Sequence, residues 1–233
     1  MVTNPSAYVI QVAMDEEAQP FIDAADESSA PVRIGRAQHR GLQVGRHTVV
    51  LVTSGIGMIN AADAAAGSVA RYGGDIAIIS AGTCGGLAAG TAVGEVVVGT
   101  ETVNVEANAV AFGYVPGQTP GMPASYATDE RLRAALSAVS VEGVPVREAA
   151  MGAGDKFATT DIAHALREGF PQLVTIDMET VAVAQVAHNH GAAFAVARGI
   201  SDLCAPGGTE FDTHVDDAAE RSARVVLAAL ESL

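Results

Sequence analysis

The sequence predicts a single α/β domain in which a sheet lies between two layers of helices. Short apolar runs, typical of buried strands, alternate along the chain with longer segments that have a helical period. Such alternation is typical of three-layer α/β/α domains. The length of 233 residues and the hydrophobic content of 49% provide enough apolar material for one core. Because no repeat or linker divides the chain, residues 1–233 are expected to form one domain.

Turn residues or charges bound each expected element in the first half of the chain. The apolar run at 8–13 predicts a strand, and the acidic residues 15–17 behind it predict the start of a helix. Further strands are expected at 41–44, 47–52, 76–81 and 96–103, and an alanine-rich helix at 58–72. Two glycine groups interrupt this order, because Gly55-Ile56-Gly57 precedes the helix and residues 82–86 are expected to end the strand at 76–81.

The second half opens with a long segment, 104–127, that contains several prolines and glycines and has no helical period. A loop of this length in a compact domain is typically functional or interfacial. Helices are then expected near 129–139 and at 161–168, 180–190 and 211–230, and strands near 146–151, up to Asp177, and at 193–198, with a loop at 152–160. The last helix carries a packed stripe on one face, at Val215, Ala218, Ala219, Ser222, Val225, Val226 and Ala229.

Composition and charge exclude several classes of partner. The formal net charge is −14 and only 13 Lys and Arg residues are present, which argues against nucleic acid or a membrane surface as a partner. The two cysteines, Cys84 and Cys204, fit a reduced chain better than a disulfide framework. Because residues 1–5 have no basic leader and no apolar run has membrane-spanning length, we expect a cytoplasmic protein.

Two acidic stretches follow predicted strands, Asp177-Met178-Glu179 and Ser201-Asp202. Ligands of open α/β sheets bind beyond the carboxyl ends of the strands, so both stretches would face the same crevice. There a carboxylate pair could hold the two hydroxyls of a ribose, and Asp202 could meet a ring nitrogen of a purine. This division of labour indicates nucleoside chemistry.

Each of these acids also has a purely structural explanation. Glu17 and Glu179 could be first-turn acids that the helix dipole favours, and Ser201-Asp202 could form a simple turn or cap. Three acids at three separate strand exits are harder to explain in this way. Carboxyl groups in different environments are also the usual source of an acid and a base in one pocket.

Other chemistries find little support. Asn60 stands where a dinucleotide-binding motif starting at Gly55 would have its third glycine, and residues 82–86 lack the lysine of a P-loop. His188 and His190 are two positions apart near a helix end, which cannot aim both rings at one ion. No zinc-protease or serine-hydrolase motif is present. We therefore expect neither a metal nor a cofactor.

Taken in order, the motifs resemble those of the 5′-methylthioadenosine/S-adenosylhomocysteine nucleosidases, a family of the nucleoside phosphorylase superfamily. The resemblance covers nearly the whole chain and implies a nucleoside phosphorylase-like fold with a central mixed, twisted sheet. It rests on eight short segments that are weak singly and specific together, at residues 13–17, 54–57, 82–87, 111–121, 154–157, 170–172, 177–179 and 200–202.

The resemblance implies a role for each candidate residue. Asp202 would be the general acid that protonates adenine N7, and Glu17 would activate the attacking water, with Thr83 and Arg198 nearby. The substrate-binding positions would be Ile56 at the 5′ tail, Thr83, Phe157 and Ala158 at adenine, Met178 and Glu179 at the ribose, Arg198 and Ser201. The neighbouring subunit of a homodimer would complete the tail pocket with Phe112, Tyr114 and Pro120.

Several positions depart from the family pattern. Thr83 stands where serine is usual, and Cys84 replaces a small alanine. Asp177 replaces a glutamate and is one methylene shorter, which puts a supporting contact to Arg198 in doubt. Residues 104–108 lack an expected His/Asp-rich run, so the interface around the tail pocket is expected to differ.

Two alternatives stay open beside a hydrolase. A purine nucleoside phosphorylase shares the fold and the Met-Glu and Ser-Asp motifs, but phosphate requires fixed cations. Here the acidic residues 15–17 and Ser80 occupy the places where hexameric phosphorylases carry arginines. A non-catalytic adenosine-binding protein would have no need of both Glu17 and Asp202. We therefore expect hydrolysis of 5′-methylthioadenosine, S-adenosylhomocysteine and related 5′-modified adenosines, a set that the sequence does not rank.

Overall fold

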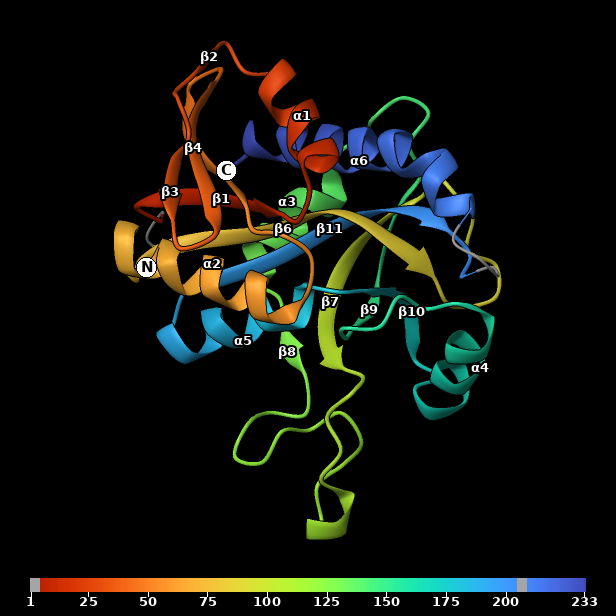
Figure 1. Ribbon diagram of the computed structural model, residues 1–233. Helices are drawn as coiled ribbons and strands as arrows, with labels where there is room; N and C mark the ends of the chain where they lie inside the picture. Colours follow the sequence, from red (N-terminus) through yellow and green to blue (C-terminus); the bar gives the residue numbers. More distant parts are fainter. Residues whose placement is uncertain (1–4, 205–208) are drawn as a thin grey trace.

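In the computed structural model, which describes residues 5–204 and 209–233, the described chain forms an eleven-stranded sheet flanked by helices (Figure 1). Its strands are β1 (Ala7–Val12), β2 (Glu27–Ser28), β3 (Val32–Ile34), β4 (Ala37–Val44), β5 (His47–Thr53), β6 (Ile76–Gly86), β7 (Val96–Asn104), β8 (Tyr126–Ala127), β9 (Val146–Ala153), β10 (Leu173–Asp177) and β11 (Ala193–Asp202). Its helices are α1 (Asp15–Asp23), α2 (Met58–Tyr72), α3 (Glu130–Ala138), α4 (Thr160–Gly169), α5 (Thr180–His190) and α6 (Thr209–Leu230), with a 3₁₀ turn η1 (Val110–Phe112).

The strand order is β10-β9-β7-β11-β6-β1-β5-β4-β2, and β3 and β8 pair with β4 and β7. Strands β5, β1, β6 and β11 are parallel. Strand β7 is antiparallel to β11 and starts a second parallel group with β9 and β10. Because Thr175 and Ile176 of β10 also pair with the end of β6, this side of the sheet curls back on itself. The curl brings the end of β10 close to the ends of β6 and β11.

Helices cover both faces of the sheet, which confirms the expected three-layer fold with a mixed central sheet. Helices α1, α3 and α6 pack on one face, where Phe21, Leu136 and Val225 belong to one buried cluster. Helices α2 and α5 pack on the other face, over a second cluster that contains Ala65 and Val183. Figure 1 shows the two groups on opposite sides of the sheet, with α4 at one end.

Two strands run further than the sequence predicted. The strand expected to stop at residue 81 continues to Gly86 in β6, and the strand expected to end at Arg198 continues to Asp202 in β11. The glycines there mark close approach rather than chain breaks. A Cβ on Gly199, for example, would collide with the backbone of Ala218, so glycine lets α6 lie directly on β11.

Other boundaries follow the prediction closely, and α2 and α5 begin and end at the expected residues. The prediction missed β2, β3 and the first half of β4, because these edge strands are short or polar. The segment expected as a plain loop at 104–127 contains η1 and β8, and it projects from the body of the protein (Figure 1). Within the described ranges, no helix is both long and apolar enough to cross a membrane.

Candidate active site

A cavity of about 160 Å³ lies where β1, β6, β10 and β11 end. All ten positions that the sequence proposed for the catalytic and same-subunit binding groups line it, namely Glu17, Ile56, Thr83, Phe157, Ala158, Met178, Glu179, Arg198, Ser201 and Asp202. These residues come from segments far apart in the sequence, and the parallel central strands bring them to one edge.

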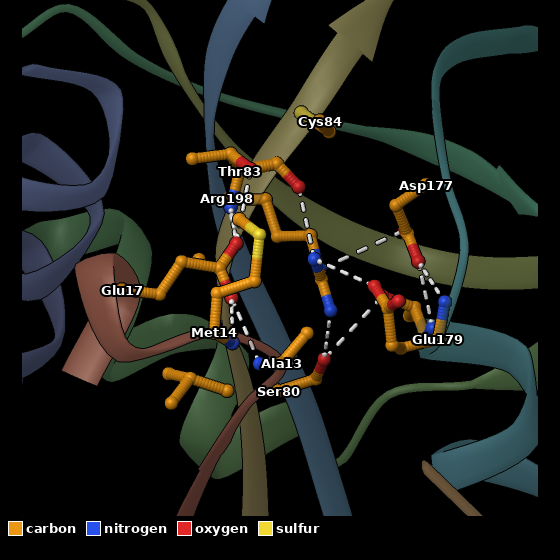
Figure 2. A network of polar contacts seen from close by, with 12 residues as sticks. Ala13, Met14, Glu17, Ser80, Thr83, Cys84, Asp177, Glu179 and Arg198 are labelled. Atoms are coloured by element: carbon orange, nitrogen blue, oxygen red, sulfur yellow. Dashed lines mark hydrogen bonds and ion pairs between the residues drawn. The ribbon is translucent and has the colours of Figure 1, made fainter. Parts of the chain in front are cut away.

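The carboxylate of Glu17 is buried and held by four hydrogen bonds (Figure 2). Oε2 accepts from the backbone N–H groups of Ala13 and Met14, at 2.8 and 3.2 Å. Oε1 accepts from the backbone N–H and the hydroxyl of Thr83, at 2.8 and 2.9 Å. The bond from Met14 is half of a capping box at the start of α1, so the structural role considered for this acid is real. The other bonds aim the carboxylate at β6 and the cavity.

Gly82 is needed where β6 passes Glu17. Its φ of +121° lies in a region that favours glycine, and a Cβ at this position would collide with the Glu17 carboxylate. Its N–H donates to the Ser222 hydroxyl at 3.1 Å, which joins this point of β6 to α6. The glycine thus lets the carboxylate approach the backbone of Thr83 closely.

Arg198 lies at the centre of the second polar cluster and is 1% exposed (Figure 2). It lies 3.3 Å from Glu179 Oε2 and 3.7 Å from Asp177 Oδ2. Its remaining N–H groups donate to the Thr83 carbonyl at 2.9 Å and the Ser80 hydroxyl at 3.0 Å. Burial alone would lower the pKa of Arg198, but the two carboxylates outweigh it and raise that pKa above its ordinary value.

Asp177 makes the contact to Arg198 that its shorter side chain put in doubt, but at a distance too long for a hydrogen bond. Its Oδ1 instead accepts from the backbone N–H groups of Glu179 and Thr180, at 2.8 and 2.7 Å, and so satisfies the start of α5. Within the part of the chain that the structure describes, neither Asp177 Oδ2 nor Arg198 Nε has a hydrogen-bond partner. Asp177 and Arg198 therefore form an ion pair without a hydrogen bond between them.

Glu179 occupies the N-cap position of α5, next to its first turn, and its side chain makes no capping hydrogen bond. Its Oε1 accepts from the N–H of Gly57 at 2.9 Å, and its Oε2 faces Arg198. Burial raises the pKa of Glu179 to about 7, with Arg198 opposing the shift and Asp177 and Glu17 adding to it.

Asp202 is the last residue of β11 and is buried. Its Oδ2 accepts from the Ser201 hydroxyl and its Oδ1 from the backbone N–H of Cys204, each at 2.9 Å. Burial raises the pKa of this carboxyl above its ordinary value, against these two hydrogen bonds and with a smaller contribution from Glu210. The carboxyl group of Asp202 therefore holds its proton to a higher pH than an ordinary aspartate does.

Aromatic and apolar groups complete the wall near Asp202. Phe157 is 40% exposed and packs edge-on against Phe211, with ring centroids 5.7 Å apart. The sequence prediction placed Phe211 in the last helix but not in the site. It also left eight other lining residues out of the predicted site, namely Ala13, Met14, Cys84, Gly85, Lys156, Ile176, Asp177 and Cys204. The one signal for Phe211 in the sequence was its position as an aromatic residue near the start of the last helix.

The residues expected to act from a neighbouring subunit do not line this cavity. Phe112, Tyr114 and Pro120 lie on the projecting segment, and Phe112 is 83% exposed. Val110 and Val115 on the same segment are also exposed. Among the residues that the structure describes, no group of three or more His, Cys, Asp or Glu side chains is arranged to hold a metal.

The chain matches a family model described as the phosphorylase superfamily over residues 7–231. A 5′-methylthioadenosine/S-adenosylhomocysteine nucleosidase from Anoxybacillus flavithermus is 38% identical, with 76% of this chain and 78% of the relative covered. One from Bacillus cereus is 32% identical over 95% of this chain and 96% of its own. A solved structure of such an enzyme from Neisseria meningitidis, in complex with methylthio-immucillin-A, superposes with a TM-score of 0.93 at 31% identity, covering 98% of this chain and all of that one.

Proposed function

The chain belongs to the 5′-methylthioadenosine/S-adenosylhomocysteine nucleosidases of the phosphorylase superfamily, and from this we propose that it hydrolyses 5′-thioadenosines with Asp202 as the acid and Glu17 as the base. The observation that carries the proposal is the presence, within one cavity, of two buried carboxyl groups that are held by different numbers of hydrogen bonds. Burial raises the pKa of Asp202, whereas the carboxylate of Glu17 accepts four hydrogen bonds. One group is suited to give a proton and the other to take one.

In the proposed reaction, adenine lies between Phe157 and Asp202, and the protonated Asp202 carboxyl donates to N7. Protonation lets the base depart neutral as the N-glycosidic bond breaks, leaving positive charge on the ribose ring. The ionised carboxylates on the sugar side of the cavity stabilise this charge. Glu179 accepts hydrogen bonds from the ribose hydroxyls, which fixes C1′ relative to the nucleophile.

Glu17 then removes a proton from a water molecule that attacks C1′. Both of its oxygens are occupied by donors, and three of the four donors are fixed backbone N–H groups. The hydroxyl of Thr83 is the exception, because it can rotate about its C–O bond. Rotation of this hydroxyl frees a lone pair of Oε1 for the water. The hydroxyl retained at position 83 therefore has a function in this scheme.

The cations of the site favour water over phosphate as the nucleophile. Arg198 is buried between Asp177 and Glu179, so its charge is already compensated. Lys156, the other cationic lining residue among those described, lies 3.5 Å from Glu106 and its side chain is 70% exposed. A phosphate ion would meet Glu17 without a free guanidinium to offset the repulsion.

We further propose a cytoplasmic homodimer. The exposed apolar side chains of Val110, Phe112 and Val115 project on one segment, as expected for a surface that a second copy covers. In this arrangement Phe112, Tyr114 and Pro120 close the tail pocket of the partner. The free, buried thiols of Cys84 and Cys204 fit a reducing compartment.

The test of hydrolysis is adenine release from 5′-methylthioadenosine with and without inorganic phosphate. We expect the same initial rate in both buffers and free 5-methylthioribose as the sugar product, measured by chromatography. A rate proportional to phosphate, with a pentose 1-phosphate as product, would show phosphorolysis instead. No release from any adenine nucleoside, despite binding, would make the protein a non-catalytic adenosine binder.

The pH profile offers a second test, through Ser201→Ala. The Ser201 hydroxyl stabilises the ionised form of Asp202, so its removal is expected to raise the pKa of that carboxyl further. Because the acid must be protonated to act, the alkaline limit of kcat/KM should move to higher pH. Ser137→Ala, which changes a half-buried serine of α3 that does not line the cavity, is the control. An alkaline limit that stays in place or moves to lower pH would argue against Asp202 as the titrating acid.

A further inference from the structure

Residues 154–159, called the purine loop below, join β9 to α4 without forming a helix or a strand. The loop carries Phe157 and Ala158, which line the active-site cavity on the side where the proposed reaction places adenine. Since these two residues belong to no regular element, whatever holds the beginning of the loop also determines where they lie in the cavity.

A second cavity, of about 310 Å³, lies on the other side of the purine loop. Its wall is formed by Val105, Glu106, Gly154, Lys156, Asp161, Ile162, Ala165, Leu166 and Ile176. Lys156 and Ile176 line the active-site cavity as well, so this part of the loop separates the two cavities. Because atoms beside a cavity lack packing partners on that side, packing holds the loop weakly here. Polar contacts must therefore fix it.

Two acidic side chains supply these contacts at the beginning of the loop. Asp155 Oδ1 accepts a hydrogen bond from the backbone N–H of Met58, at the start of α2, at 2.7 Å. Glu106 Oε2 accepts from the backbone N–H of Asp155 at 3.0 Å, and Glu106 Oε1 lies 3.5 Å from Lys156 Nζ. The carboxylate of Glu106 thus contacts the two loop residues that directly precede Phe157.

The backbone on both sides of this contact is shaped for it. Asn104 Oδ1 accepts from the N–H groups of Glu106 and Ala107, at 2.9 and 3.0 Å, which fixes the turn that follows β7. On the loop, a Cβ at Gly154 would lie 2.8 Å from Glu106 Cγ, so glycine lets the glutamate side chain pass close to the loop backbone. Glu106 therefore starts from a fixed turn and reaches a matching gap.

We propose that Glu106 is a positioning residue for the purine end of the active site, which places Phe157 and Ala158 by holding the N–H of Asp155. The inference rests on the proposed function, from which it takes adenine as the ligand of the loop. Glu106 lines only the second cavity, so it acts through the loop and not by touching the substrate. The ion pair with Lys156 contributes little, because the lysine side chain is 70% exposed.

The expected effect is on binding rather than on the chemical step, since adenine contacts the loop both before and after the N-glycosidic bond breaks. For Glu106→Ala, we expect Kd for adenine, measured by titration calorimetry, and KM for 5′-methylthioadenosine to rise together by about tenfold, as for one lost hydrogen bond to a charged group. The value of kcat should change little.

Two further variants of the same residue separate positioning from a general loss of structure. Glu106→Gln keeps an oxygen that can accept from the N–H of Asp155, so its Kd for adenine should stay close to the original value. Glu106→Asp keeps the charge but is one methylene too short, and it should resemble Glu106→Ala. Glu168→Ala is the control, because it removes an exposed glutamate of α4 that pairs with His164 and lines neither cavity.

The outcomes distinguish this inference from the proposed function. If the unmodified protein hydrolyses 5′-methylthioadenosine but Glu106→Ala binds adenine as tightly as before, the function stands and the positioning role is wrong. If the variants differ in adenine affinity as expected but no nucleoside is hydrolysed, the positioning role stands and hydrolysis is wrong. A glutamine variant as weak as the alanine variant, or a protein that does not bind adenine at all, would overturn the inference.

Discussion

Replacing Asp202 by asparagine is expected to lower kcat for adenine release by about 10²–10⁴-fold, the range typical of a lost general acid. Asparagine keeps the shape of the side chain, and its carbonyl oxygen can still accept a hydrogen bond from the Ser201 hydroxyl or the Cys204 N–H. What it lacks is an acidic proton for the departing base. Binding of adenine should change little, since the wall formed by Phe157 and Phe211 is untouched.

The same variant makes a prediction about stability. A carboxyl whose pKa is raised in the folded state contributes stability below its unfolded pKa, and this contribution is lost as the pH rises through the folded pKa. Asparagine carries no charge at any pH and avoids that loss. Asp202→Asn should therefore be no less stable than the original protein under mildly alkaline conditions, so a loss of kcat there cannot be ascribed to unfolding.

Rapid-quench measurement of adenine release, together with thermal melting at the same pH, would check both statements. Asp212→Asn is the matched control, because it changes an exposed aspartate on α6 that lies outside the cavity. If Asp202→Asn turned over at the original rate, another group would have to protonate the base and the acid would be misassigned.

Local sequence patterns predicted much of this fold, since helices and buried strands are encoded by periodicity and capping. The predicted ranges of α2 and α5 agree with the structure, and in both helices a glycine, Gly73 or Gly191, follows the last turn and marks the end. The ends of β6 and β11 were missed because glycines near these ends were taken to break the strands. Whether a glycine breaks a strand or permits close approach depends on what packs against it, and the partners of Gly82 and Gly199 lie far away in the sequence.

In the candidate site, too, some residues could be predicted from local sequence patterns and others could not. Its acids could be found because each follows an apolar strand, and their positions in one cavity follow from parallel topology. Phe211 escaped notice because a helix position gives no indication of which cavity the helix end faces.

Replacing Glu17 by glutamine is expected to abolish most turnover while adenine nucleosides still bind, with a loss in kcat of about 10²–10⁴-fold. A glutamine has nearly the same shape but cannot take a proton from water. The substitution also conflicts with its surroundings, because all four contacts of the present carboxylate are donors. If the amide oxygen accepts from Ala13 and Met14, the amide NH₂ must face the N–H of Thr83.

This donor–donor conflict is buried, so it should cost about 1–3 kcal/mol of unfolding free energy. Glu16→Gln, one residue earlier on the exposed side of α1, should change neither stability nor kcat and is the matched control. Glu17→Asp serves as a second variant, because it keeps a base but withdraws it by one methylene. We expect Glu17→Asp to retain more activity than Glu17→Gln. Single-turnover kinetics would measure the activity of each variant, and denaturant unfolding would measure its stability. If the glutamine variant proved the faster of the two, position 17 would act through its hydrogen bonds alone, and a different group would have to activate water.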